Sequence, residues 1–110
     1  MQPDELMAEA VAATGLDDFG GDGFREGLDE YCRSVVAEAR LNELGQAAIR
    51  GNIVGNLANR LKVVAYAAEH PDVATSAIEA PLVVVGMFRA GTTFLSYLLE
   101  QDPANRALLH

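Results

Sequence analysis

At 110 residues and a formal net charge of −8, this chain has the size of one domain, and its acidity disfavours binding to nucleic acid or to an anionic membrane. Half of its residues are hydrophobic and 22% are charged, a composition that excludes a disordered chain. Because Cys32 is its single cysteine, an internal disulfide and a cysteine metal cluster are excluded as well. The N-terminus lacks the basic start and long apolar run of a signal peptide, and the apolar run Leu82 to Gly86 is too short to cross a bilayer, so we expect a cytoplasmic protein without a membrane span.

Two helices are predicted in the acidic first part of the chain. The first covers Pro3 to Ala13, where Pro3 suits an opening turn and acidic residues lie near the positive end of the helix dipole. Gly15 is expected to end it, and residues 16–23 to form a turn-rich connector. One apolar stripe at spacings of three and four predicts the second helix: Phe24, Leu28, Tyr31, Val35 and Ala39. Cys32 is expected to be a small core residue of this helix.

The segment Asp18 to Asp29 partly resembles a calcium-binding loop, with acidic residues at the first, fifth and twelfth places and glycine at the sixth. However, Gly20 occupies the third ligand place, where a side-chain oxygen is required. A helix start capped by Asp22 is the favoured interpretation.

The third and longest helix is predicted from about Asn42 to Glu69, because His70 and Pro71 end the pattern. Its apolar stripe consists of Leu44, Ala48, Ile53, Leu57, Leu61, Val64 and Ala68. Three glycines (Gly45, Gly51 and Gly55) weaken this helix by roughly 1 kcal/mol each if exposed, which suggests the close approach of another element such as the second helix. The basic residues Arg50, Arg60 and Lys62 are expected to form a solvated polar face.

After a linker, the pattern changes at residue 81. The run Pro81 to Gly86 is β-branched and apolar on both faces, which is typical of a buried parallel strand, and Thr92 to Gln101 has the apolar spacing of a helix. We therefore predict an α/β fold with two parts. Residues 1–80 form a helical N-terminal region, and residues 81–110 contribute a strand, a tight loop and a helix.

The loop between the predicted strand and helix has the spacing of a phosphate-binding loop. Gly86 and Gly91 are separated by four residues, as in a Walker-type motif, but Thr92 stands where that motif has lysine. The cation is instead Arg89. Glycines let backbone N–H groups converge on an anion, the following helix adds its positive end, and threonine hydroxyls and arginine add donors. This pattern predicts binding of a phosphate- or sulfate-bearing nucleotide, with no built-in demand for magnesium.

The stretch GMFRAGTTFL, Gly86 to Leu95, resembles the 5′-phosphosulfate loop of sulfotransferases, whose bacterial members commonly have GxPRSGTT. The segment Leu98 to Leu109 resembles the continuation of that loop, and Ala39 to Leu61 resembles the helical N-terminal extension of bacterial members. In place of the usual proline and serine or threonine, this chain has Phe88 and Ala90.

The resemblance implies a donor, 3′-phosphoadenosine-5′-phosphosulfate, and transfer of its sulfonate to a hydroxyl or amine of a small-molecule acceptor of unknown type, without a metal. Arg89 matches the catalytic and donor-binding cation, which stabilises charge on the leaving phosphate. The other donor-binding positions are Ala90, Gly91, Thr92 and Thr93.

The resemblance also implies a longer enzyme, because the elements that bind the 3′-phosphate and the general base lie outside these residues. Residues 81–110 are then the incomplete start of its P-loop-like parallel-sheet domain, and we expect the N-terminal part of a sulfotransferase that lacks turnover alone. Two alternatives remain open at this point: a fragment of a phosphate-loop kinase or NTPase, and a non-catalytic helical interaction module.

Overall fold

The computed structural model describes residues 1–77, 80–87 and 89–105 of the chain. They divide into two compact units, the first unit (Met1–Ser76) and the second unit (Ala77–His110), and each is described by itself. The predicted division at residue 80 and the roles assigned to its two parts stay predictions.

Helix α1 spans Pro3–Thr14, close to the predicted bounds. Proline at its start needs no N–H partner, and Asp4 and Glu5 in its first turn face the positive end of the helix dipole. Gly15 ends the helix as expected, because it adopts a left-handed backbone (φ 70°) and its N–H donates to the carbonyl of Val11 at 2.8 Å.

Helix α2 spans Arg25–Glu38 and follows a short 3₁₀ turn, Asp22–Phe24. The predicted cap is wrong, since Asp22 lies inside the 3₁₀ turn and no side chain caps either element. The carboxylate of Asp18 instead accepts a hydrogen bond from the N–H of Gly20 at 2.7 Å, a local turn contact.

Helix α3 spans Glu43–Glu69, as the sequence predicts. Asn42 caps it, with its side-chain oxygen accepting from the N–H of Gly45 at 2.9 Å. His70 leaves the helical conformation, and the short helix α4, Pro71–Ala74, begins where a linker was expected.

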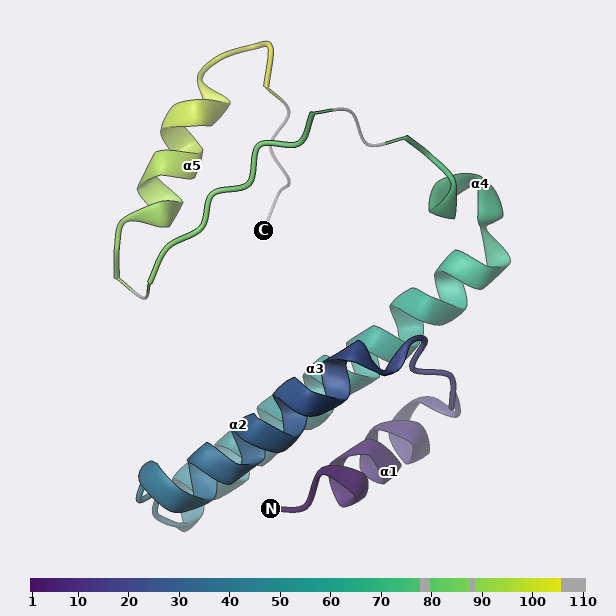
Figure 1. Cartoon of the computed structure of the whole chain (residues 1–110), viewed down its shortest axis with the longest axis vertical. Helices are drawn as coiled ribbons and strands as arrows, with labels where there is room; N and C mark the ends of the chain where they lie inside the picture. The colour runs from purple at the N-terminus through teal and green to yellow at the C-terminus, as the bar shows by residue number, and fades with distance from the viewer. Residues whose placement is uncertain (78–79, 88, 106–110) are drawn as a thin grey trace. The chain divides into compact units, whose positions relative to one another are not determined.

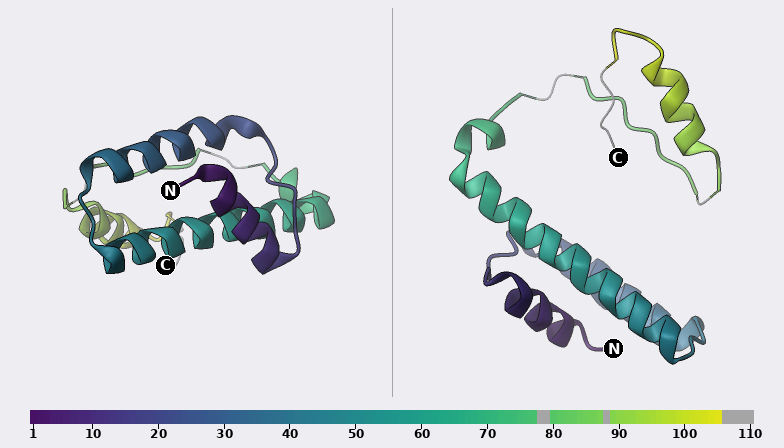
Figure 2. Two further views of the ribbon diagram at one scale, coloured as in Figure 1. Left: turned by 90° about the horizontal axis from the view of Figure 1, so that it is seen from below. Right: turned by 180° about the vertical axis from the view of Figure 1, so that it is seen from behind.

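The core of the first unit lies where α1, α2 and α3 meet (Figures 1 and 2). Helix α1 packs mainly against α3 and also touches α2. The buried side chains are Leu6, Ala10, Cys32, Ile53, Leu57 and Leu61. The prediction for Cys32 is confirmed, and burial raises the pKa of its thiol. Leu44, by contrast, belongs to the predicted stripe but is 78% exposed.

Arg60 does not belong to a solvated polar face, which corrects the sequence interpretation. Its Nε donates to the carbonyl of Phe19 at 2.7 Å and its Nη2 to the carbonyl of Gly21 at 3.1 Å. The guanidinium also lies 4.4 Å from the ring centroid of Phe24. Arg60 therefore holds the connector between α1 and α2 against α3.

Arg50 is likewise engaged, as it pairs with Glu9 and lies 4.0 Å from Glu5, both on α1. A further ion pair joins Arg25 of α2 to Asp4. Charged contacts of this kind tie α1 to both other helices, although pairs so exposed contribute little stability each.

The glycines of α3 are not explained by the close approach of α2, which corrects a second expectation. A Cβ atom added at Gly51 or Gly55 would meet nothing within 4 Å. At Gly45 it would lie 3.3 Å from side-chain atoms of Leu41 and Asn42, in the helix's own capping turn.

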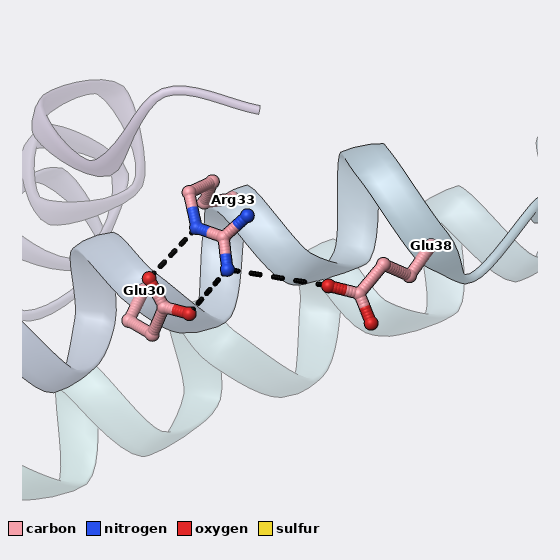
Figure 3. Close-up of polar contacts among 3 residues, drawn as sticks. All are labelled: Glu30, Arg33 and Glu38. Carbon is pink, nitrogen blue, oxygen red and sulfur yellow. Dashed lines mark hydrogen bonds and ion pairs between the residues drawn. The ribbon is translucent and has the colours of Figure 1, made fainter.

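On the surface of α2, Arg33 forms a local ion-pair group (Figure 3). Its Nε and Nη2 contact the two carboxylate oxygens of Glu30 at 2.8 and 2.5 Å, and Glu38 lies 4.0 Å away. The hydrogen bond from Arg33 lowers the pKa of Glu30, and the same bond raises the pKa of Arg33.

The predicted α/β fold is wrong for the part of the chain that the structure describes, which forms helices and no strand. Residues 81–87 are coil, and among the described residues no backbone hydrogen bond involves 81–86. A β-branched run favours extended backbone locally, but a strand also needs a neighbour to complete its hydrogen-bond ladder.

The following helix α5 spans Thr92–Glu100, one residue short of its predicted end.

Candidate functional site

The candidate site is the glycine-bounded loop of the second unit, described at residues 86–87 and 89–91, together with the first two residues of α5, Thr92 and Thr93. The N–H of Ala90 donates to the carbonyl of Met87 at 3.1 Å and closes a turn. Arg89 and Gly91 both have a left-handed backbone, with φ of 66° and 82°. A positive φ is uncommon at a residue other than glycine, so the backbone at Arg89 marks a constrained turn.

The first turn of α5 presents backbone donors that its own helix does not use. The first helical bond runs from the N–H of Leu95 to the carbonyl of Gly91 at 3.0 Å, so the preceding amides have no partner within the helix. No side chain caps this helix. These amides, at the positive end of the helix dipole, form a local environment that favours an anion.

Side chains on this first turn are held by short-range contacts. The hydroxyl of Ser96 donates to the carbonyl of Thr92 at 3.0 Å. A Cβ atom added at Gly86 would lie 2.7 Å from Cγ2 of Thr92 and 3.4 Å from Cβ of Ala90. The glycine spacing in the sequence identifies Gly86 but not these two contacts, since spacing carries no signal of what a glycine approaches.

The five predicted site residues are contiguous and occupy one turn and the start of one helix. Arg89, Ala90, Gly91 and Thr93 are exposed, and Thr92 is half-buried. Phe88 and the end of the resembling segment 98–109 lie outside the described residues. The arrangement brings one cation, two hydroxyls and several amides to one place, and their binding role stays a prediction at this point.

A groove lies in the first unit, between α2 and α3. This groove of about 430 Å³ is lined by Phe24, Leu28, Tyr31, Asn52, Ile53, Asn56, Leu57 and Arg60. Its polar groups are largely engaged, because Asn56 donates to Asn52 at 3.2 Å and Arg60 bonds to the connector. The groove therefore offers a weaker binding chemistry than the loop.

Across residues 1–77, 80–87 and 89–105, no group of three or more His, Cys, Asp and Glu side chains gathers as a metal site would require. Over the same residues, none of the helices combines the length and apolar character needed to cross a membrane.

Two solved structures are similar to the chain over nearly all of its length. Sulfotransferase STF1 from Mycobacterium tuberculosis is 38% identical with a TM-score of 0.84, over 98% of this chain and 30% of that one. Sulfotransferase STF9 from Mycobacterium avium is 40% identical with a TM-score of 0.80, over 97% of this chain and 27% of that one. No family model and no curated protein matches the sequence.

These similarities confirm the resemblance stated from the sequence, because both structures match the helical region and the loop together at 38–40% identity. The chain covers under a third of each neighbour. The chain therefore belongs to the bacterial sulfotransferase family.

Proposed function

We propose that this chain supplies the donor-binding loop of a sulfotransferase that uses 3′-phosphoadenosine-5′-phosphosulfate. One observation carries the proposal: a turn with left-handed backbone at Arg89 and Gly91 leads directly into α5, in a chain that matches solved sulfotransferases over 97–98% of its length. The 5′-phosphosulfate end of the donor is the anion that this loop would hold.

The residues of the loop fit such an anion. The amides at the start of α5 that have no partner within the helix provide donors, and the helix dipole adds a partial positive charge. Arg89 contributes a permanent charge with several N–H donors, while Thr92 and Thr93 contribute hydroxyls. Because no carboxylate lies in the loop, nothing there repels the anion.

The donor supplies the sulfonate group, and the loop's part in the reaction is electrostatic. As the sulfonate leaves, negative charge grows on the phosphate, and Arg89 with the neighbouring amides would stabilise that charge. The acceptor would be a hydroxyl or amine of a small molecule, whose proton must pass to a base that the loop does not contain. Alone, the chain is expected to bind the donor's nucleotide without turnover.

The test is calorimetric titration of the chain with adenosine 3′,5′-bisphosphate and, separately, with Mg-ATP. We expect saturable binding of the bisphosphate that weakens about tenfold or more in Arg89→Ala, because a charge-assisted contact is lost. Arg33→Ala, which removes an arginine from α2, is the matched control and should bind as the unmodified chain does. Tighter binding of Mg-ATP than of the bisphosphate, or an equal loss of bisphosphate affinity in both variants, would overturn the proposal.

A gain of affinity can be sought at Ala90, where other bacterial members commonly have serine. Ala90→Ser adds one hydroxyl donor at an exposed position of the loop, so the bisphosphate should bind about tenfold more tightly. Ala104→Ser, outside the loop, is the control that should leave the affinity unchanged.

A further inference from the structure

We infer that Gly86 is a positioning residue: it has no side chain so that the methyl group of Thr92 can lie against its backbone, which fixes the direction of the Thr92 hydroxyl. The inference rests on the proposed function, in which that hydroxyl is one of the donors to the anion.

The requirement for glycine at this position is steric. Gly86 is not among the residues with positive φ, so its backbone conformation is open to any residue. What excludes a side chain is the 2.7 Å distance between a Cβ atom at Gly86 and Cγ2 of Thr92, far inside van der Waals contact. The 3.4 Å distance to Cβ of Ala90 is an ordinary contact by comparison.

Thr92 cannot easily move away from such a clash. It is β-branched, and its backbone forms the first turn of α5, where its carbonyl accepts from Ser96 at 3.0 Å. The methyl and hydroxyl occupy two of the three staggered positions on one carbon, so rotation that removes the methyl from position 86 also redirects the hydroxyl. Gly86 thus permits the Thr92 rotamer of this structure, which any side chain at position 86 would exclude.

The second glycine of the loop has a different reason to be glycine. Gly91 has φ of 82°, and a Cβ atom there would meet nothing within 4 Å. Gly91→Ala would strain the backbone without touching Thr92. This contrast supplies a matched control for any effect of adding a methyl group to the loop.

The experiment is a double-mutant cycle in which Gly86→Ala is combined with Thr92→Ser, a change that removes the offending methyl and keeps the hydroxyl. Titration with adenosine 3′,5′-bisphosphate should show about tenfold weaker binding for Gly86→Ala alone, as expected when one hydrogen bond to a charged group is displaced. The double variant should recover the affinity of Thr92→Ser. Gly91→Ala should not be recovered by Thr92→Ser.

The inference would be overturned if Gly86→Ala weakened bisphosphate binding equally in the unmodified chain and in the Thr92→Ser variant, or weakened it in neither. The proposed function would still stand in both cases. If the unmodified chain binds no bisphosphate, the proposed function fails, and the steric claim is then decided by nuclear magnetic resonance. Gly86→Ala should shift the backbone amide signals of residues 92 and 93, and Thr92→Ser should suppress that shift. Unchanged signals in Gly86→Ala would overturn the steric claim as well.

Discussion

The two units of the molecule differ in how far they bury their apolar side chains. In the first unit, six side chains from three helices are buried together, and polar contacts hold the connector and α1 to α3. In the second unit, none of the described residues is buried, and Val85 and Met87 are 86% and 85% exposed. The comparison indicates that the first unit contains its own core, whereas the described residues of the second unit present a loop without a buried core.

Truncating a core side chain should cause the largest loss of stability, and it tests this contrast directly. Leu61 is 0% exposed, so Leu61→Ala removes buried methyl groups and leaves a cavity among α1, α2 and α3. We expect the free energy of unfolding of the first unit to fall by about 2–5 kcal/mol. Urea unfolding followed by circular dichroism, which reports mainly the long helices, measures it.

Leu98→Ala in α5 is the matched control, because the same chemical change is made at a side chain that is 53% exposed. Its effect on unfolding should stay within about 0.5 kcal/mol. Comparable losses from both variants would contradict the contrast, since they would require a buried environment for α5.

Removing the contacts of Arg60 with the connector should cause the next largest loss of stability. Arg60→Ala removes the donors to the carbonyls of Phe19 and Gly21 and the stacking on Phe24, so unfolding should become easier by about 1.5–3 kcal/mol. Lys62→Ala, an exposed cation two positions later, should change stability by no more than about 0.5 kcal/mol. If the two variants have the same free energy of unfolding, Arg60 belongs to a solvated face after all.

The contacts of Arg60 illustrate which part of the fold the sequence could not reveal. Its partners are backbone carbonyls, one of them 41 positions away, and carbonyls carry no residue-specific signal. The ends of α1 and α3 were predictable because Gly15, Asn42 and the His70–Pro71 pair act on neighbouring backbone. Local signals of this kind also located α5.

The strand and the site show the same division between local and non-local information. The β-branched run at Val83–Val85 predicts extended backbone but not a partner, and the described residues offer none. Glycine spacing located the loop, and the resemblance to the sulfotransferase loop named its five candidate residues. The spacing did not reveal that Gly86 approaches Thr92, because that contact depends on how the loop enters α5.

A smaller effect, opposite in sign, is expected from the exposed glycines of α3. Because a Cβ atom at Gly51 or Gly55 meets nothing within 4 Å, replacement by alanine should stabilise the helix by about 1 kcal/mol at each site. Gly45→Ala is the control that should gain less, since its Cβ atom lies 3.3 Å from Asn42 and Leu41. Destabilisation at Gly51 or Gly55 would show that another element packs on this face.

The smallest effect is expected from Glu30 and Arg33, both exposed on α2. The hydrogen bond from Arg33 lowers the pKa of Glu30 below its ordinary value of 4.5, so the folded state holds the proton of Glu30 less tightly than the unfolded state does. The contribution of this pair to stability is therefore present above that value and is lost as the pH falls through the lowered pKa. Arg33→Ala should lower the urea midpoint slightly near about pH 7, and this deficit should shrink as the pH falls through the lowered pKa of Glu30 and its carboxylate takes up a proton. Glu38→Gln, which changes the carboxylate 4.0 Å from Arg33, should shift the midpoint less than Arg33→Ala does. A deficit in Arg33→Ala that persists unchanged in acid would mean that Arg33 stabilises α2 through its aliphatic stem and not through its charge.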